Sequence, residues 1–347
     1  MQYALKYVPL GSTGLKVSNI AFGCGFRGVY DVEEAARTIE RAMDSGINFF
    51  DCADIYKLRS GIHAEEALGR AIKGCRDRVI ITSKFGAQLD ERHPVLNGAG
   101  ASRYHMIHAV EASLKRLKTD YIDVYLLHMP DCETAYEEIM RAFDQLCRDG
   151  KIRYAGLCNH KAWQITLMQE MSRQYGGCPI SVIQNPYNLL NRSAEEELFP
   201  AASYERIGTM TYSPLAAGLL GGAFAKGKEA PEKSTWSYDA CYREYRKLVF
   251  PGRISDIVDA VDELGEKYRV SSAVIATAWV LKNPDVTCAV AGADSMREFE
   301  DTLKAVCLEM SAADCAYLDQ LSLDMREVFS HPEVQAKVAA YEKIKRR

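Results

Sequence analysis

The sequence of 347 residues has no long hydrophobic run and little excess charge of either sign. No window reaches the roughly 18 consecutive apolar residues of a membrane-spanning helix, and the start MQYALKYVPLGSTG lacks the pattern of a signal peptide. Its 43 Lys and Arg against 47 Asp and Glu give a net charge of -4, which provides no general attraction to nucleic acid or to anionic membranes. We therefore expect a cytoplasmic protein whose partner is a small molecule, with no nucleic-acid or membrane partner.

Cysteine is present, but not in the spacing of a metal site. The 11 cysteines include no C-x-x-C pair, and none stands beside a histidine at metal-ligand spacing. Their number is odd, so a complete disulfide framework is not favoured. We expect no metal, and reduced thiols that pack in the interior of a protein from a reducing compartment.

Short apolar runs alternate with longer amphipathic segments along the chain. Runs rich in Val, Ile, Tyr and Phe begin at Asn19, Ile47, Val79, Tyr121, Ile152, Ser181, Gly208 and Val286. Helical spacing is found at 32–45, 64–73, 103–118, 134–149, 161–173, 194–206, 253–268, 271–282 and 295–306. The sequence therefore predicts eight strands, each followed by at least one helix.

Near-continuous apolar strands joined by helices predict a parallel sheet covered by helices, and eight such units predict a closed (β/α)8 barrel of the TIM type. An open doubly wound sheet is the alternative, although it usually has fewer strands. We expect a single α/β domain over 1–347, with its core at about 8–306. The predicted additions are an N-terminal β-hairpin, a long loop after the seventh strand at roughly 215–250, and a helical tail over 311–347. The long loop is predicted to overhang the active-site face, or else to be a disordered insertion.

The stretch GCGFRG at 23–28 matches the G-x-G-x-x-G pattern of dinucleotide-binding Rossmann domains, with Asp51 where a ribose-binding acid could stand. In that motif the third glycine opens the helix that packs on the strand. Here Asp31 is the expected N-cap, with Glu34 three residues later. We therefore favour the barrel over a Rossmann domain.

Four polar residues stand at or just after the ends of the second, third and fourth predicted strands: Asp51, Tyr56, Lys84 and His128. The carboxyl ends of neighbouring parallel strands meet at one mouth of a barrel, so we expect these side chains to lie close together. The Lys84 ammonium would lower the pKa of Tyr56, and Asp51 would be the counter-ion of Lys84. His128 could orient a substrate oxygen. Each residue alone could be structural, but the group indicates a proton-donating catalytic site.

Around these residues the sequence resembles the aldo-keto reductase family. The resemblance runs from residue 8 to about 306 and rests on the stretches LGSTGLKVS, GINFFDCADIY, EEALGRAIK, VIITSKFG, SLKRLKTDYIDVYLLHMPD, GKIRYAGLCNH, IQNPYNLL and YSPLAAGLLGG. It implies a (β/α)8 barrel that binds a nicotinamide cofactor, NAD(P)H, without a Rossmann domain. It also implies that Asp51, Tyr56, Lys84 and His128 are the catalytic tetrad, with the tyrosine protonating a carbonyl oxygen.

The resemblance further implies a cofactor site. Its expected residues are Cys24, Asp51, Cys158, Asn159, Gln184, Tyr212, Ser213, Pro214, Leu215, Gly218, Leu219, Gly292, Asp294 and Glu298. Asn159 and Gln184 complement the two ends of an amide, and the ring of Tyr212 is suited to stacking on a planar nicotinamide.

Two departures from the family pattern affect specificity. Gly25 stands where relatives commonly place a bulky aromatic residue, so the substrate pocket is expected to be wider and to be filled from elsewhere. The expected lining residues are Phe26, Tyr30, Phe85 and Trp236.

Asp294 stands where NADPH-using relatives carry Arg or Lys. A carboxylate repels a 2′-phosphate but accepts hydrogen bonds from a free ribose, which indicates a preference for NADH.

The first hypothesis is an enzyme that transfers hydride reversibly between a nicotinamide cofactor and an aldehyde, ketone or sugar-like carbonyl, with an alcohol as the other substrate. The second is a cofactor-sensing regulatory protein, because the family includes channel-associated subunits and a fold alone does not establish turnover. A third is an epimerase or lyase that uses the cofactor transiently on a sugar. The sequence does not indicate an oligomeric state.

Overall fold

The computed structural model describes residues 5–26, 28–89, 95–225, 253–293 and 295–323. Trp236 and Asp294 therefore lie outside the described residues. The chain divides into two compact units, one made of Met1–Asn185, Pro200–Tyr212 and Pro284–Glu300, the other of Pro186–Phe199, Ser213–Asn283 and Asp301–Arg347.

The first unit is built on a closed barrel of eight parallel strands. The strands are β3 (Ile20–Gly23), β4 (Phe49–Asp51), β5 (Ile80–Phe85), β6 (Ile122–Leu127), β7 (Ile152–Cys158), β8 (Ile180–Pro186), β9 (Gly208–Tyr212) and β10 (Cys288–Gly292). They follow one another in chain order, and β10 pairs with both β9 and β3 to close the ring. The predicted (β/α)8 barrel is confirmed, and the open sheet and the Rossmann domain are wrong.

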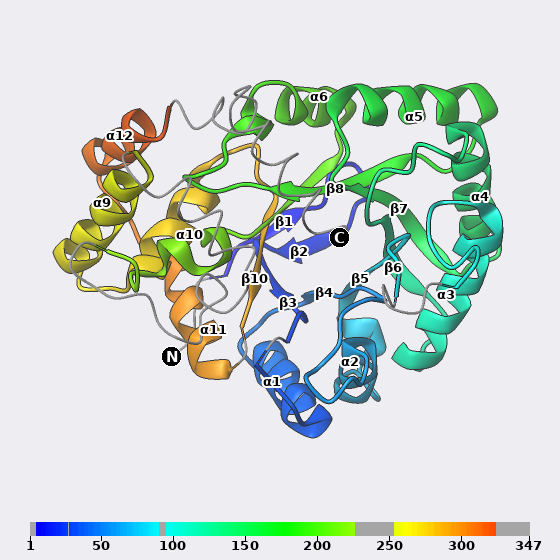
Figure 1. Cartoon of the computed structure of the whole chain (residues 1–347), viewed down its shortest axis with the longest axis horizontal. Coiled ribbons are helices and arrows are strands. Elements are labelled where there is room, and N and C mark those ends of the chain that lie inside the picture. The colour runs from blue at the N-terminus through cyan, green and yellow to red at the C-terminus, as the bar shows by residue number, and fades with distance from the viewer. Residues whose placement is uncertain (1–4, 27, 90–94, 226–252, 294, 324–347) are drawn as a thin grey trace. The chain divides into compact units, whose positions relative to one another are not determined.

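Helices surround these strands (Figure 1). They are α1 (Val32–Asp44), α2 (Ala64–Ala71), α3 (Arg103–Leu117), α4 (Tyr136–Arg148) and α5 (Ala162–Tyr175), with a short 3-10 helix, η1, at Arg76–Arg78. Two further helices, α6 (Leu198–Glu205) and α11 (Met296–Leu303), follow β8 and β10 in the chain. Helix α1 begins where predicted, because the Asp31 carboxylate accepts a hydrogen bond from the amide of Glu33.

The predicted N-terminal hairpin is present as β1 (Tyr7–Pro9) and β2 (Lys16–Ser18). Leu10 and Val17 are fully buried in one cluster with residues inside the barrel such as Phe49 and Val124. The Ser12 amide donates to the carbonyl of Arg206, just before β9 begins. The hairpin thus covers the end of the barrel at which the strands begin, and the opposite end is the one that carries active sites in this fold.

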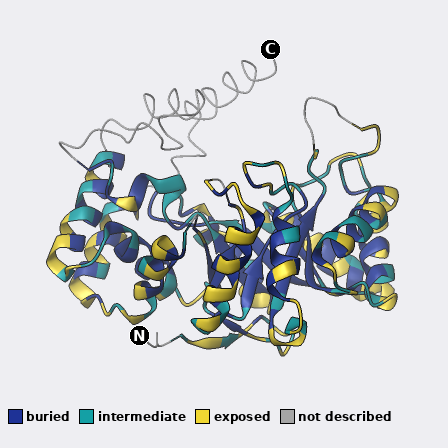
Figure 2. Cartoon of the chain, turned by 90° about the horizontal axis from the view of Figure 1, so that it is seen from below, coloured by how far each residue is buried: buried dark blue, intermediate teal, exposed yellow. Residues whose placement is uncertain are grey.

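The eight strands of the barrel are largely buried, whereas the helices around them show exposed residues on their outer faces (Figure 2). Strand β6 is buried at every position, as expected for a strand covered on both faces. No helix within the described ranges is both long enough and apolar enough to cross a membrane.

The second unit is helical in its described parts. Its elements are η2 (Ser193–Glu195), η3 (Ala216–Gly221), α9 (Arg253–Tyr268), α10 (Ser272–Lys282), η4 (Lys304–Cys307) and α12 (Ala312–Leu321). Helix α9 packs on both α10 and α12, and the ammonium of Lys267 lies 2.7 Å from the carboxylate of Asp314 across the second contact. The predicted helical tail is confirmed as far as Leu321. Most of the predicted long loop, residues 226–252, lies outside the described residues.

Candidate active site

A buried ion pair lies at the end of the barrel where the strands finish. Asp51 is the last residue of β4, and Lys84 stands one residue before the end of β5. The Lys84 ammonium donates to Asp51 Oδ2 at 2.8 Å and to the carbonyl of Cys52 at 2.8 Å, and the lysine side chain is 0% exposed. An ammonium removed from water in this way is stabilised only by close oxygen partners, which here come from the last residue of β4 and the residue that follows it.

Tyr56 lies in the loop that follows β4, and its phenol oxygen lies 3.3 Å from Lys84 Nζ. His128 follows β6 directly, and its ring meets the ring of Tyr56 edge-on with centroids 5.9 Å apart. The structure thus brings together all four residues of the predicted tetrad, which are separated by up to 77 positions in the sequence. The common carboxyl end of parallel strands is the physical reason for this convergence.

Two further side chains hold the Asp51 carboxylate. The Thr82 hydroxyl donates to Asp51 Oδ1 at 2.6 Å, and Gln184 Nε2 donates to the same oxygen at 2.7 Å. Sequence reasoning missed Thr82. The available signal was its position two residues before Lys84 on one strand, because residues i and i+2 of a strand point to the same face.

The pKa of Tyr56 is raised, which corrects the expectation that Lys84 lowers it overall. Burial raises it most, the Lys84 charge lowers it only in part, and the Asp51 charge raises it again. For Lys84, burial acts to lower the pKa, but the nearby Asp51, Tyr56 and Cys158 outweigh burial and the net pKa is raised. At neutral pH the site therefore holds a protonated phenol beside a charged ammonium.

His128 is neutral over most of the physiological range. Burial lowers its pKa to about 4, and the charge of Lys84 adds to that effect. Its Nδ1 atom is buried with no hydrogen-bond partner among the described residues. A neutral imidazole carries one N–H, so His128 can donate a single hydrogen bond to an oxygen placed near Tyr56.

Two side-chain amides lie beside the ion pair, at the ends of β7 and β8. Asn159 Nδ2 donates to the carbonyl of His128 at 2.9 Å, and Gln184 Nε2 donates to Asp51. The remaining contacts of the two NH2 groups are to sulfur, with Asn159 Nδ2 3.3 Å from Met129 Sδ and Gln184 Nε2 3.8 Å from Met210 Sδ. Sulfur is a weak acceptor, so one N–H of each amide can turn to a stronger oxygen acceptor such as a carboxamide. The residues present therefore fit the amide of a nicotinamide.

Tyr212, the last residue of β9, donates its hydroxyl hydrogen to Asn159 Oδ1 at 2.7 Å. Asn159 itself has a φ of 63°, a left-handed conformation that is uncommon outside glycine and is frequent at functional positions. Cys158, with its thiol 3.7 Å from Gln184 Oε1, is buried in the barrel core. These three predicted cofactor residues lie in the barrel unit at the same end as Asp51.

The other predicted cofactor residues are distributed over both units. Cys24 follows β3, and its amide donates to the carbonyl of Asp51 at 2.8 Å. Gly292 ends β10 in register with Gly23, and Glu298 is an exposed residue of α11. The remainder follow β9 in the chain, within the second unit: Ser213, Pro214, Leu215, Gly218 and Leu219. Ser213 and Gly218 have positive φ values of 57° and 97°, so this segment turns tightly.

Of the four predicted lining residues, Phe26, Tyr30 and Phe85 are described. Phe85 is fully buried and stacks on Tyr125 at 4.9 Å, and its edge meets Phe143 of α4. Phe26 is 1% exposed and packs against Phe22, while Tyr30 is 69% exposed. A side chain at Gly25 would instead face the site, because a Cβ atom there would lie 4.0 Å from the Tyr56 ring.

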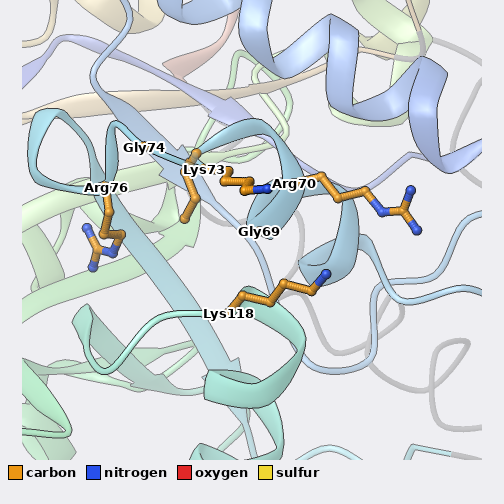
Figure 3. A pocket seen from close by; sticks show the side chains of 7 residues that line it. Gly69, Arg70, Lys73, Gly74, Arg76 and Lys118 are labelled. Atoms are coloured by element: carbon orange, nitrogen blue, oxygen red, sulfur yellow. The ribbon is translucent and has the colours of Figure 1, made fainter.

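A separate pocket of about 640 Å³ lies at the C-terminal ends of α2 and α3 (Figure 3). It is lined by Gly69, Arg70, Ile72, Lys73, Gly74, Arg76 and Lys118. Arg76 is already paired with Asp123 at 2.7 Å, and Arg70 with Glu33. None of the tetrad residues lines this pocket. Within the described ranges, no group of His, Cys, Asp and Glu side chains has the arrangement of a metal site.

The closed barrel with a polar cluster where its strands end is typical of barrel enzymes. The model of the Aldo/keto reductase family matches residues 19–323, and the chain belongs to this family of oxidoreductases of small-molecule carbonyl compounds. It is 32% identical to the versiconal hemiacetal acetate reductase of Aspergillus parasiticus, over 91% of this chain and 96% of that protein. It is 34% identical to the uncharacterized oxidoreductase YrpG of Bacillus subtilis, over 87% of this chain and 91% of that protein.

A third relative is named as a channel subunit and not as a reductase or oxidoreductase. The "Probable voltage-gated potassium channel subunit beta" of Arabidopsis thaliana is 34% identical over 87% of this chain and 91% of that protein.

Proposed function

We propose that the chain is a reductase that uses NAD(P)H to reduce an aldehyde, ketone or sugar-like carbonyl, with Tyr56 as the general acid. The observation that carries this proposal is the Lys84 ammonium, which lies 3.3 Å from the Tyr56 oxygen and 2.8 Å from Asp51 at the end of the barrel where the strands finish. A protonated phenol beside a fixed positive charge can give up its proton as negative charge develops on a substrate oxygen.

The proton moves from Tyr56 Oη to the carbonyl oxygen. The phenolate that remains is stabilised by the adjacent Lys84, which stays charged because its pKa is raised. Asp51 keeps Lys84 in place, and Asp51 is itself oriented by Thr82 and Gln184. Neutral His128 donates a hydrogen bond that positions the same substrate oxygen.

A bound nicotinamide supplies the hydride in this reaction. Asn159 and Gln184 would hold its carboxamide, and the ring of Tyr212 would stack on its pyridine ring. For the rest of the cofactor we propose the other residues that the family resemblance implies: Cys24, Ser213, Pro214, Leu215, Gly218, Leu219, Gly292 and Glu298.

We infer a preference for NADH from Asp294. A carboxylate near the adenosine ribose repels the 2′-phosphate of NADPH and accepts hydrogen bonds from the diol of NADH. Asp294→Arg should move the ratio of the two dissociation constants toward NADPH by about tenfold or more, since one charge-assisted hydrogen bond contributes roughly 1.5–3 kcal/mol. Cofactor fluorescence titration measures both dissociation constants. An unchanged ratio would show that Asp294 does not determine the preference between NADH and NADPH.

The proposed reaction can be tested by the loss of absorbance of the reduced nicotinamide with a reactive aromatic aldehyde. Tyr56→Phe removes only the phenol hydroxyl, and with it the acidic proton, and should lower turnover by about 10²–10⁴-fold while cofactor affinity changes little. Tyr104→Phe is the matched control, because Tyr104 is 62% exposed. Equal turnover in wild type and Tyr56→Phe would refute the assignment of Tyr56.

We infer that Gly25 makes room for bulky substrates beside the catalytic tyrosine. It has no side chain to occupy the space facing the Tyr56 ring. Gly25→Phe should lower kcat/KM for a bulky aromatic aldehyde far more than for propanal, with Gly25→Ala intermediate. An equal loss for both aldehydes would indicate general damage to the site rather than a narrowed pocket.

A cofactor-sensing regulatory protein is the second candidate, and the relative named as a potassium channel subunit favours it. A sensor should bind the cofactor tightly but turn over far more slowly than once per minute with every carbonyl compound offered. An epimerase or lyase with transient redox chemistry should convert its substrate with no net consumption of cofactor. The absorbance assay, combined with analysis of the product, separates both from a reductase.

A further inference from the structure

Two cysteines from different elements meet at the surface of the barrel unit. Cys147 stands in the last turn of α4, and Cys178 stands in the loop between α5 and β8. Their Sγ atoms are 2.7 Å apart. Both thiols are free and partly exposed to solvent. The sulfurs need to approach by only about 0.6 Å to reach the usual disulfide bond length of about 2.05 Å.

The loop that carries Cys178 is fixed on both sides. The Cys178 amide donates to Asp144 Oδ1 of α4 at 3.1 Å, and the Gly177 amide donates to the carbonyl of Ser172 in α5 at 3.0 Å. The Ser172 hydroxyl in turn donates to the carbonyl of Gly177 at 3.0 Å. The contact between Cys147 and Cys178 is therefore supported by hydrogen bonds that join the loop of Cys178 to both α4 and α5.

We propose that Cys147 and Cys178 form a redox-active dithiol site that hydrogen peroxide converts to an intramolecular disulfide. Cytosolic disulfides are usually transient and serve redox sensing or catalysis, and partial exposure gives a small oxidant access to this pair.

Cys178 is the thiol that reacts first. A hydrogen bond from Cys147 lowers the pKa of Cys178, which raises the fraction of the nucleophilic thiolate. The Cys178 thiolate attacks one peroxide oxygen, the O–O bond breaks, and a sulfenic acid and hydroxide form. Cys147 then attacks the sulfenic sulfur, the S–O bond breaks and the S–S bond forms. In sum, two thiols and one peroxide give one disulfide and two water molecules, so the thiols lose two electrons and the peroxide gains them.

The site is separate from the tetrad. Cys178 comes just before β8 begins, and Cys147 lies at the end of α4, just before β7 begins. Both therefore lie at the end of the barrel where strands start, opposite the end that carries Asp51 and Lys84.

The chain also provides an internal comparison, because Cys24 and Cys52 are neighbouring thiols that are both 0% exposed.

The test treats the folded full-length protein with hydrogen peroxide, blocks remaining thiols with iodoacetamide, and digests it without reductant. Mass spectrometry should find one linked peptide pair that joins Cys147 to Cys178 and disappears on reduction, with the loss of two alkylatable thiols per chain. Cys24 and Cys52 should become alkylatable only after unfolding. Cys132→Ser, at an exposed cysteine, is the matched control and should leave the crosslink unchanged.

In Cys147→Ser the resolving thiol is missing, so Cys178 should accumulate as a sulfenic acid that dimedone traps. Circular dichroism and cofactor oxidation should match wild type in this variant, because the pair lies away from the tetrad. The proposal is overturned if Cys147 and Cys178 stay fully alkylatable in peroxide-treated wild type. It is also overturned if the linked peptides join other cysteines or two separate chains.

Discussion

Asp54 is a buried carboxylic acid in the loop that leads from Asp51 to Tyr56. It is 1% exposed, and neither carboxylate oxygen has a hydrogen-bond partner among the described residues. Both backbone groups of Asp54 form hydrogen bonds. The Asp54 amide donates to the carbonyl of Lys84 at 3.1 Å, and the Asp54 carbonyl accepts from His63 Nδ1 at 2.7 Å. Burial, and then the nearby charge of Glu65, raise the pKa of Asp54 to about 7.

Because the pKa of Asp54 differs between the folded and unfolded states, Asp54 makes a pH-dependent contribution to the stability of the protein. The folded state holds the Asp54 proton up to about pH 7, whereas an unfolded aspartate loses it near pH 3.9. The contribution of Asp54 to stability is therefore fully present below about pH 4 and is lost as the pH rises through 7.

Asp54→Asn should raise the free energy of unfolding at pH 8 by about 2–4 kcal/mol, because it replaces a buried charge with a neutral group of similar shape. At pH 4.5 the gain in the variant should shrink to about 1 kcal/mol or less, because most of the Asp54 contribution is then still present. Urea denaturation at the two pH values measures this difference, with Asp77→Asn at an exposed position as the control. A variant that is destabilised equally at both pH values would show that the Asp54 carboxylate has a partner that it needs.

Gly69 allows α2 to pack closely against the end of α3. A Cβ atom at Gly69 would lie 2.5 Å from the carbonyl oxygen and 2.7 Å from the carbonyl carbon of Leu117. These are backbone atoms, which cannot turn aside as a side chain could. The same contact brings Arg116 of α3 to 2.6 Å from the buried carboxylate of Glu65 in α2.

Gly69→Ala should therefore lower the free energy of unfolding by about 1–3 kcal/mol through overpacking, although alanine favours a helix more than glycine does. Gly221→Ala is the control, because a Cβ atom there would have no neighbour within 4 Å. Thermal or urea unfolding of the two variants makes the comparison. Equal stability of Gly69→Ala and wild type would show that α2 can shift away from α3 at little cost.

Arg192 connects η2 to α12 in the second unit. Its guanidinium pairs with Glu195 at 2.7 Å and 2.9 Å, and it also donates to the carbonyl of Asp319 at 2.8 Å and to the Ser322 hydroxyl at 3.0 Å. Arg192 is 6% exposed, so the loss of its guanidinium would remove a buried positive charge that lies 2.7 Å from the Glu195 carboxylate.

Arg192→Met should lower stability by about 3 kcal/mol and speed amide hydrogen exchange in α12. Arg192→Met combined with Glu195→Gln should recover much of the loss, because the carboxylate that Arg192 neutralises is then replaced by an uncharged amide. Hydrogen exchange followed by mass spectrometry distinguishes the two variants. Unchanged exchange over Ala312–Leu321 in the single variant would show that α12 is held by its apolar contacts alone.

At the scale of the whole molecule, the sequence was sufficient to predict the barrel because its strands are covered on both faces and appear as uninterrupted apolar runs. Helix boundaries were less predictable. The helix expected over 194–206 is instead η2 followed by α6 from Leu198, because Pro200 fits the first turn of a helix but not its interior. The helix expected from 134 begins at Tyr136, because the Asp131 carboxylate binds the amide and hydroxyl of Thr134.

The ion pair with Tyr56 and His128 could be located from strand ends, because topology alone brings these ends together. The residues that line the substrate site could not be located in this way, because they depend on loop conformation and on which face of a strand each side chain occupies. Phe85 shows the effect of strand alternation. Successive side chains of a strand point to opposite faces, so Phe85 points outward to Phe143 of α4 while Lys84 points into the barrel. Ser83 follows the same rule and donates to Glu65 of α2. Trp236 and Asp294 stay sequence predictions because they lie outside the described residues.

The central claim is that Tyr56 supports hydride transfer to a carbonyl carbon, and the most direct test follows the hydride itself. Reduced nicotinamide labelled with deuterium at C4 is incubated with an aromatic aldehyde, and the alcohol is analysed by mass spectrometry. Wild type should transfer one deuterium to the carbinol carbon, and Tyr56→Phe should form this product about 10²–10⁴-fold more slowly. Bound cofactor without labelled alcohol, or labelled alcohol formed equally fast by both proteins, would contradict the account.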